Sequence, residues 1–298
     1  MLEKGYTVIG TVRSYRHLNV SGFEHLRILG KVVLEELDLL DMGNLIRIIQ
    51  KHKPDEIYNL AAQSSVGLSF DQPLGTFSFN TASVNNLLES IRLFSPHTRM
   101  YQASSSEMYG DVTSLPITLD TPMNPVSPYG VSKMSSYFMI KTYRDSYGLF
   151  VSNGVMFNHE SFLRSDNFFV KKVIKNALLI KDNKLDCLIV GNLDVRRDFG
   201  YAPMYVEAMW KILQMEHADD FIISSGKSVL LRDIVEHVFE RLNLSIDLII
   251  EDQKLFRPNE IFEIYGDNSK SKEKLDWDYK HSFFDILDIL IEQEVASK

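Results

Sequence analysis

Short apolar runs alternate with longer amphipathic stretches along the first half of the chain. Runs rich in β-branched and aromatic residues predict strands at residues 6–12, 31–37, 56–60, 99–103 and 149–157. Stretches with helical periodicity predict helices at residues 44–52, at residues 76–94 and from Pro128 onward. Strands that alternate with helices are typical of an α/β fold with a doubly wound parallel sheet, covered by helices on both faces.

The second half of the chain predicts fewer strands. We expect strands at residues 185–190 and 220–224, and helices at residues 205–214, 229–242 and 283–294. We therefore expect two parts. Residues 1–158 form the helix-covered sheet, and residues 159–298 form mainly a smaller C-terminal lobe, with some segments returning to the first part.

The helix at residues 76–94 carries an apolar stripe. Its members are Leu87, Leu88, Ile91 and Leu93, which we expect to face the core. This helix is therefore predicted to be mostly structural.

Polar side chains follow several of the predicted strands. Ligands of open α/β sheets bind at the carboxyl ends of the strands, and Ser64, Ser105, Glu107 and Asn158 all fall at such ends. Ser105 and Glu107 lie two residues apart, so alternation along an extended chain predicts that both face the same ligand.

Tyr129 and Lys133 lie four residues apart in SPYGVSK. On a helix this spacing places both side chains on one face. A lysine there can lower the pKa of the phenol and help to hold a ribose, which makes the tyrosine a usable base. An ordinary exposed helix pair is the structural alternative.

Composition narrows the class of protein. The 298 residues carry a net charge of −8, which argues against a nucleic-acid partner, and they include one cysteine, Cys187, so an internal disulfide is excluded. The chain has neither a signal-peptide layout nor an apolar run long enough for a bilayer. We expect a cytoplasmic location and no membrane partner. The scattered histidines predict no metal site.

Four segments occur in an order that is typical of one protein family: YQASSSEMYG, SPYGVSK, FNHES and GNLDVRRDFG. They resemble the GDP-mannose 4,6-dehydratase family of the extended short-chain dehydrogenase/reductase superfamily. The resemblance continues through YVEAMWKILQ to FRPNEIFEIYGDNSKSKEKLDW, so it covers nearly the whole chain. It implies a Rossmann-like NADP-binding domain, a substrate-binding lobe, and a homodimer or homotetramer that acts on GDP-mannose or a related GDP-sugar.

The resemblance also implies a reaction, the conversion of a GDP-hexose to its 4-keto-6-deoxy form through transient oxidation of C4 by bound NADP. Tyr129 takes the proton of the 4-hydroxyl. Glu107 removes the C5 proton and assists the loss of water from C6. Ser105 bonds the C4 oxygen, and Lys133 lowers the pKa of the tyrosine and holds the nicotinamide ribose.

The binding residues that the resemblance implies fall into two sets. The cofactor set is Arg13, Asp38, Leu39, Ala61, Ala62, Ser64, Tyr129, Lys133, His159 and Arg164. The substrate set is Asn158, Lys172, Arg197, Arg257 and Glu260. Structural alternatives remain for some members. Arg13 either meets the 2′-phosphate of NADP or is a solvated loop residue. Asp38 contacts adenine, caps the helix that begins near Met42, or does both.

The chain departs from the family pattern in two places. Relatives have a strand and a glycine-rich loop before LEKGY, which bind the pyrophosphate, and no such loop occurs near the start of this chain. We therefore expect the chain to retain little NADP. The family continues after FNHES-like segments with Pro-Arg-Arg-Gly, whereas this chain has residues 162–165, FLRS.

These departures keep three alternatives open. The first is a related nucleotide-sugar epimerase, against which Glu107 weighs because inversion at C4 needs no base at C5. The second is a GDP-heptose dehydratase, which the altered loop at residues 162–165 allows. The third is an inactive truncated paralogue.

Overall fold

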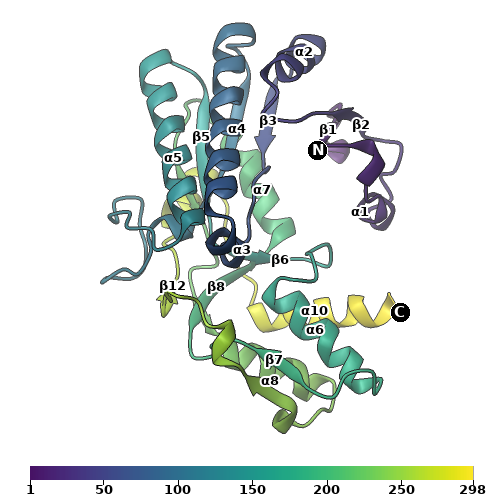
Figure 1. Ribbon diagram of the computed structural model, residues 1–298. Helices are drawn as coiled ribbons and strands as arrows, with labels where there is room; N and C mark the ends of the chain where they lie inside the picture. The colour runs from purple at the N-terminus through teal and green to yellow at the C-terminus, as the bar shows by residue number, and fades with distance from the viewer. Residues whose placement is uncertain (298) are drawn as a thin grey trace.

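The computed structural model describes residues 1–297. It has a helix-covered sheet in its upper half and a smaller lobe below it (Figure 1). The helices are α1 (Ser21–His25), α2 (Met42–His52), α3 (Val66–Asp71), α4 (Pro73–Phe94), α5 (Pro128–Tyr147), α6 (Phe169–Lys181), α7 (Ala202–Leu213), α8 (Leu231–Arg241), α9 (Ser269–Leu275) and α10 (Phe283–Ala296). The strands are β1 (Ile9–Val12), β2 (Val33–Glu36), β3 (Glu56–Asn59), β4 (Arg99–Ser105), β5 (Val151–Met156), β6 (Asn158–Glu160), β7 (Leu188–Val190), β8 (Arg196–Tyr201), β9 (Phe221–Ile223), β10 (Ser228–Leu230), β11 (Ile249–Glu251) and β12 (Glu263–Ile264).

The central sheet has four parallel strands in the order β3-β4-β5-β9. Strand β9 comes from the second half of the chain and pairs with β5. Strands β1 and β2 form a separate two-stranded parallel sheet. The parallel strands that the alternating pattern predicts are therefore present, but they lie in two sheets.

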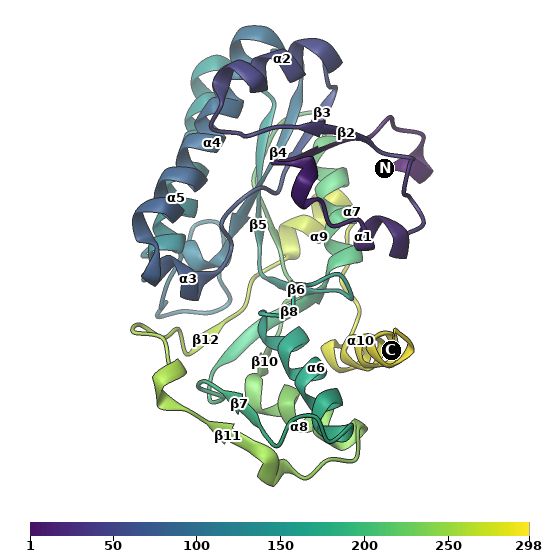
Figure 2. The same ribbon diagram turned by 45° about the vertical axis from the view of Figure 1, so that its right-hand side comes forward.

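Helices cover both faces of the central sheet. Helices α2, α4 and α5 lie on one face, and α7 and α9 lie on the other (Figure 2). Each face of the central sheet has its own apolar core, and successive side chains of β4 point to opposite faces. Met100 packs with residues of α4 and α5, whereas Tyr101 packs with residues of α7. This arrangement confirms the predicted α/β class and its doubly wound sheet.

The apolar stripe of α4 is confirmed only in part. Leu87, Leu88 and Ile91 are buried, whereas the side chain of Leu93 is 52% exposed. Each helical residue turns by about 100°, so Leu93 lies nearly opposite Ile91 on the helix. The prediction for Leu93 was wrong because its spacing does not fit the stripe.

Two helix starts also differ from the sequence prediction. Helix α7 begins at Ala202, ahead of Tyr205, because Pro203 fits the first helical turn. Val229 lies in β10, and α8 begins only at Leu231. Pairing of β10 with β8 therefore prevails over helix propensity at Val229.

The C-terminal lobe is built around β8. This strand pairs antiparallel with β10 and parallel with β12 and β6. Helices α6, α8 and α10 pack against each other beside it and enclose a core that includes Val173, Phe199, Val235, Phe239 and Leu287. Because β6 directly follows β5 along the chain, the lobe begins at the carboxyl end of the central sheet.

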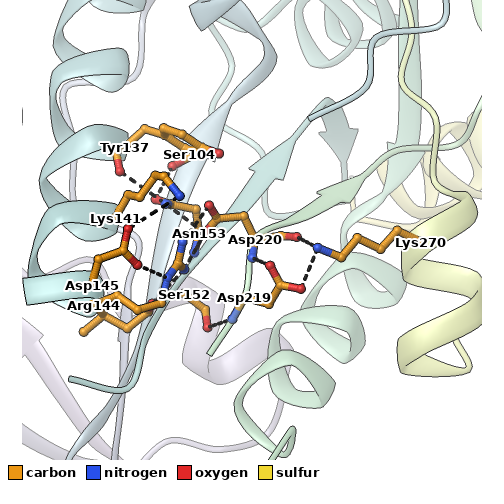
Figure 3. Close-up of polar contacts among 11 residues, drawn as sticks. Ser104, Tyr137, Lys141, Arg144, Asp145, Ser152, Asn153, Asp219, Asp220 and Lys270 are labelled. Carbon is orange, nitrogen blue, oxygen red and sulfur yellow. Dashed lines mark hydrogen bonds and ion pairs between the residues drawn. The ribbon is translucent and has the colours of Figure 1, made fainter. Parts of the chain in front are cut away.

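A buried polar network fixes α5 to the central sheet (Figure 3). The guanidinium of Arg144 binds both carboxylate oxygens of Asp220, at 2.8 Å and 3.0 Å. The same carboxylate accepts hydrogen bonds from the backbone and side-chain nitrogens of Asn153, both at 3.1 Å. These contacts join α5, β5 and the start of β9, and so they orient the helix that carries Tyr129.

None of the helices in residues 1–297 is long and apolar enough to cross a membrane.

Candidate active site

Three neighbouring elements converge at the carboxyl end of β4. They are the strand end itself with Ser105, a short 3-10 helix at Ser106–Met108, and the first turns of α5. The Ser127 hydroxyl caps α5 by accepting a hydrogen bond from the Gly130 amide at 3.0 Å, and Pro128 follows in the first turn. This capped start fixes where Tyr129 and Lys133 leave the helix.

Ser105 and Glu107 adjoin each other, but not as strand alternation predicts. Glu107 lies in the 3-10 helix, and its backbone amide donates to the Ser105 hydroxyl at 3.3 Å. The prediction that Ser105 and Glu107 lie on one extended strand was therefore wrong. The chain turns after Ser105 because that hydroxyl satisfies the amide of Glu107 and caps the turn.

Tyr129 is buried, and burial raises the pKa of its phenol to about 12. A hydrogen bond with the Ser105 side chain and the positive charge of Arg164 lower this pKa, while the charge of Glu107 raises it further. Burial dominates because the phenolate would lose its hydration. The structure thus brings Ser105, Glu107 and Tyr129 into one site.

Lys133 lies beside Tyr129 on α5. Its ammonium is 5.8 Å from the centroid of the Tyr129 ring and donates to the Ala103 carbonyl at 2.8 Å. Burial lowers the pKa of Lys133 to about 8, so most of it is protonated at pH 7. Lys133 is not among the groups that shift the pKa of Tyr129, which burial raises. The role of Lys133 toward Tyr129 stays a prediction.

Four charged residues form an arginine–carboxylate cluster next to Ser105 and Tyr129. Its members are Glu107, Arg197, Arg257 and Glu260. Arg257 Nη1 lies 3.5 Å from Glu107 Oε1, and Arg197 Nη2 donates to Glu260 Oε1 at 2.9 Å. Burial lowers the pKa of Arg197, and the charge of Glu107 opposes that change. The cluster therefore joins one predicted catalytic residue to three predicted substrate residues.

Asn158 and His159 lie on β6, at the junction with the lobe. Nδ1 of His159 lies 2.9 Å from the carbonyl oxygen of Phe157, and burial lowers the pKa of the imidazole to about 4. His159 is therefore neutral at pH 7. Its Nδ1 donates to the carbonyl, and its Nε2 is left as an acceptor.

The altered loop at residues 162–165 is held by its own contacts. Phe162 stacks on His25 of α1 with ring centroids 4.3 Å apart. Arg164 lies 3.7 Å from Glu160 and 3.5 Å above the ring of Phe168. Burial raises the pKa of Glu160 to about 7, although the charge of Arg164 opposes it. The loop therefore has an aromatic contact where the family pattern has proline.

Several predicted cofactor residues lie elsewhere along the sheets. They follow β1, β2 and β3 and are Arg13, Asp38, Leu39, Ala61, Ala62 and Ser64. The guanidinium of Arg13 lies 5.2 Å from the ring of Phe79 on α4. Among residues 1–297, no hydrogen bond or ion pair joins these six residues to Tyr129 or to the arginine–carboxylate cluster. Their roles stay predictions.

The proposed capping role of Asp38 was wrong. The cap of α2 is Asp41, whose side chain accepts from the Asn44 amide at 3.0 Å, whereas Asp38 accepts from the Leu40 amide. Asp41 has the helix-capping position because it directly precedes Met42. Lys172, from the substrate set, donates to the Ile189 carbonyl at 3.0 Å within the lobe, and it makes no contact with the cluster among the described residues.

Asn80 is a supporting residue that the sequence analysis did not single out. Its side chain accepts from the Gln63 amide at 2.8 Å and donates to the Ser132 hydroxyl at 2.9 Å. It therefore ties the loop after β3 to the α5 segment that carries Tyr129 and Lys133. The signal was a buried polar stripe on α4, formed by Thr76, Asn80 and Ser83 at spacings of four and three.

Asp198 was also missed as a supporting residue. Its carboxylate accepts from the amide and hydroxyl of Ser225 and from the amides of Gly226 and Gly266. It follows Arg197 directly on β8, so it fixes the strand beside the cluster.

No group of histidine, cysteine and carboxylate side chains within residues 1–297 could hold a metal ion.

Comparison with solved structures shows the class of fold. The chain shares its fold with dTDP-glucose 4,6-dehydratase from Bacillus anthracis in complex with NAD, with a TM-score of 0.87, 19% identity, and coverage of 99% of this chain and 90% of that chain. It also shares the fold of RMD from Pseudomonas aeruginosa complexed with NADPH, with a TM-score of 0.82, 21% identity, and coverage of 96% and 98%. These likenesses show that the chain has the same Rossmann-like α/β fold as these two structures.

Sequence comparison shows the family to which the chain belongs. The model of the family described as GDP-mannose 4,6 dehydratase matches residues 1–290. The GDP-mannose 4,6-dehydratase of Yersinia enterocolitica is 37% identical, over 93% of this chain and 84% of that protein. The chain belongs to the GDP-mannose 4,6-dehydratase family, which confirms the resemblance found in its motifs.

Proposed function

We propose that this protein is a hydro-lyase that converts a GDP-hexose, GDP-mannose in the first place, to the GDP-4-keto-6-deoxy sugar. One observation carries the proposal: the hydrogen-bonded pair of Ser105 and Tyr129 adjoins Glu107 and the arginine–carboxylate cluster. The serine hydroxyl and the tyrosine phenol can bind and deprotonate one sugar hydroxyl, while the carboxylate removes a proton from a neighbouring carbon. Family membership supports the same reaction.

Tyr129 is the proposed base for the 4-hydroxyl, and Ser105 bonds the same oxygen. A phenol with a pKa near 12 is protonated at pH 7, so catalysis requires a lower pKa in the complex with ligands. Arg164 already lowers this pKa by its charge, and Lys133 lies close enough to add to the effect once the site is filled. Glu107 removes the C5 proton and assists the departure of the C6 hydroxyl.

NADP is the proposed cofactor, and the residues at the nicotinamide end fit it. The buried ammonium of Lys133 uses one donor for the Ala103 carbonyl, which leaves others for a ribose hydroxyl. His159, Arg164, Ala61, Ala62 and Ser64 complete this end. Arg13, Asp38 and Leu39 are assigned to the adenosine end, and the pyrophosphate has no assigned partner in residues 1–297. When bound, NADP would supply the hydride-transfer chemistry that transient oxidation at C4 requires.

The proposed division of labour follows the fold. Residues 1–158, with the returning segments, bind NADP, and residues 159–298 bind mainly the GDP-sugar. Asn158, at the junction with the lobe, and Arg197 face the sugar and diphosphate, whereas Lys172, Arg257 and Glu260 in the lobe hold the nucleotide. We further propose a cytoplasmic homodimer or homotetramer.

A substrate panel tests this proposal. The protein is incubated with NADP and GDP-mannose, a GDP-heptose, dTDP-glucose or UDP-glucose, and the products are analysed by mass spectrometry and NMR. We expect a product that has lost one water from GDP-mannose and none from the dTDP or UDP sugars. Faster conversion of the GDP-heptose would assign the altered loop at residues 162–165 to that substrate. A product of unchanged mass with inverted C4 would refute the dehydratase and favour an epimerase.

A further inference from the structure

Arg257 pairs with a carboxylate that the proposed reaction needs as a base. Its Nη1 lies 3.5 Å from Glu107 Oε1, and the Glu107 side chain is only 14% exposed. Arg257 belongs to the substrate set that the resemblance implies, and in this structure it contacts Glu107. The pair therefore joins two functions, nucleotide binding and proton removal, in a single contact.

The two arginines of the cluster differ in how firmly they are held. Arg197 lies on β8, is buried, and donates both to Glu260 and to the Arg196 carbonyl. Arg257 follows the 3-10 helix at Gln253–Leu255, lies outside the regular elements, and has a side chain that is 36% exposed. Arg257 is thus the arginine of the cluster whose side chain can change partner without disturbing a strand.

We propose that Arg257 exchanges the Glu107 carboxylate for the ligand diphosphate, so that nucleotide binding releases the base. The proposal rests on the proposed GDP-sugar dehydratase function. A diphosphate offers more negative charge and more acceptor oxygens than one carboxylate, and a guanidinium binds such groups through paired hydrogen bonds. The ligand should therefore win the competition for Arg257.

The exchange has a chemical consequence at Glu107. In the ion pair, the guanidinium of Arg257 contacts one oxygen of the Glu107 carboxylate. Withdrawal of Arg257 frees that oxygen to accept a proton at the moment when the sugar is in place. A sugar without its diphosphate would leave the Arg257–Glu107 pair intact. Binding energy at the nucleotide end is therefore used to free Glu107, the base near C5.

Competition for one arginine is reciprocal, and this makes the proposal testable without turnover. If Glu107 competes with the diphosphate, its removal must strengthen diphosphate binding by the same coupling. The probe is GDP, and the measurement is isothermal titration calorimetry on the parent, Glu107→Gln, Arg257→Ala and the double variant. We expect Glu107→Gln to tighten GDP binding by about two- to fivefold, the range of a partly exposed ion pair. In the Arg257→Ala background the same substitution should change GDP affinity little.

A matched variant controls for the simple loss of a negative charge. Glu263 pairs with Arg196 at 3.3 Å, so Glu263→Gln removes a carboxylate of the same lobe without touching Arg257. We expect GDP affinity to stay within about twofold of the parent. Equal tightening by Glu107→Gln in both backgrounds, or by Glu263→Gln, would show general charge repulsion and overturn the exchange.

Two further outcomes separate this proposal from the function on which it rests. GDP binding by the parent with no tightening in Glu107→Gln overturns the exchange alone and leaves the dehydratase function standing. Failure of the parent to bind GDP at all overturns the proposed GDP-sugar function, and the exchange with it. Circular dichroism of each variant confirms that the compared proteins are folded.

Discussion

Removal of Arg144 should strongly destabilise the protein and make its stability depend on pH. Arg144 and Asp220 have side chains that are only 14% and 7% exposed, and they share two hydrogen bonds (Figure 3). Breaking a buried ion pair from one side typically costs about 3–5 kcal/mol, because the remaining charge is left uncompensated. We expect Arg144→Met to lower the free energy of unfolding by about that amount at pH 7.

The matched substitution on the other side should cost less. In Asp220→Asn the guanidinium of Arg144 keeps its hydrogen bond to the Val151 carbonyl at 3.1 Å, and the amide that replaces the carboxylate retains one acceptor oxygen. The double variant should be less destabilised than the sum of the two single variants, because the second substitution removes the charge that the first left unpaired.

The pH dependence supplies a second signature. In the parent, hydrogen bonds from Arg144 and Asn153 outweigh burial and lower the pKa of Asp220 below 3.8, so the group stays ionised between pH 7 and pH 5. In Arg144→Met, burial acts without the arginine and raises this pKa, so the folded state takes up a proton as the pH falls. The stability lost by the variant should therefore be largest at pH 7 and smaller at pH 5.

Urea unfolding followed by circular dichroism at both pH values measures these effects for the parent, the two single variants and the double variant. A loss below about 1 kcal/mol in Arg144→Met, strict additivity in the double variant, or a loss that does not change with pH would refute this account of the network.

Three further predictions test other parts of the structure. Leu88→Ala should cost about 2–5 kcal/mol of stability, whereas Leu93→Ala, on the exposed face of the same helix, should cost less than about 0.5 kcal/mol in the same urea assay. His159, with its pKa lowered to about 4, should stay neutral between pH 8 and pH 5.5 in NMR titration, and stability should fall as the pH drops from about 6.5 toward 4. Tyr129→Phe should keep the stability of the fold but reduce turnover of GDP-mannose by about 10²- to 10⁴-fold, and turnover near that of the parent would remove Tyr129 from the mechanism.

Much of the fold was predictable because its elements are local and strongly patterned. The start of α5 has a serine cap and a proline in its first turn, and both act within a few residues of Tyr129. Leu93 was wrongly predicted to face the core, because its spacing along α4 places it on the exposed side. Val229 was wrongly predicted to be helical, because it pairs in β10. The separate sheet of β1 and β2 was not predictable, since strand order depends on contacts far apart in sequence.

The site was predictable as a set of residue types but not as a set of contacts. The order of the motifs indicated Ser105, Glu107, Tyr129 and Lys133, and the structure places all four around the carboxyl end of β4. No local pattern could show that Arg257, 150 residues away, would pair with Glu107. The raised pKa of Tyr129 was likewise hidden, because burial is a property of the whole fold.

The central claim is that this site eliminates water across C5 and C6 of a GDP-sugar, with Glu107 as the base at C5. The most direct measurement follows GDP-mannose with NADP in D₂O, for the parent and for Glu107→Gln, by NMR and by nicotinamide absorbance. The parent should place deuterium at C5 of a 4-keto-6-deoxy product, while the variant should still reduce the nicotinamide but stall before losing water. Dehydration by the variant at the parent's rate, or inversion at C4 by the parent without deuterium at C5, would contradict the claim.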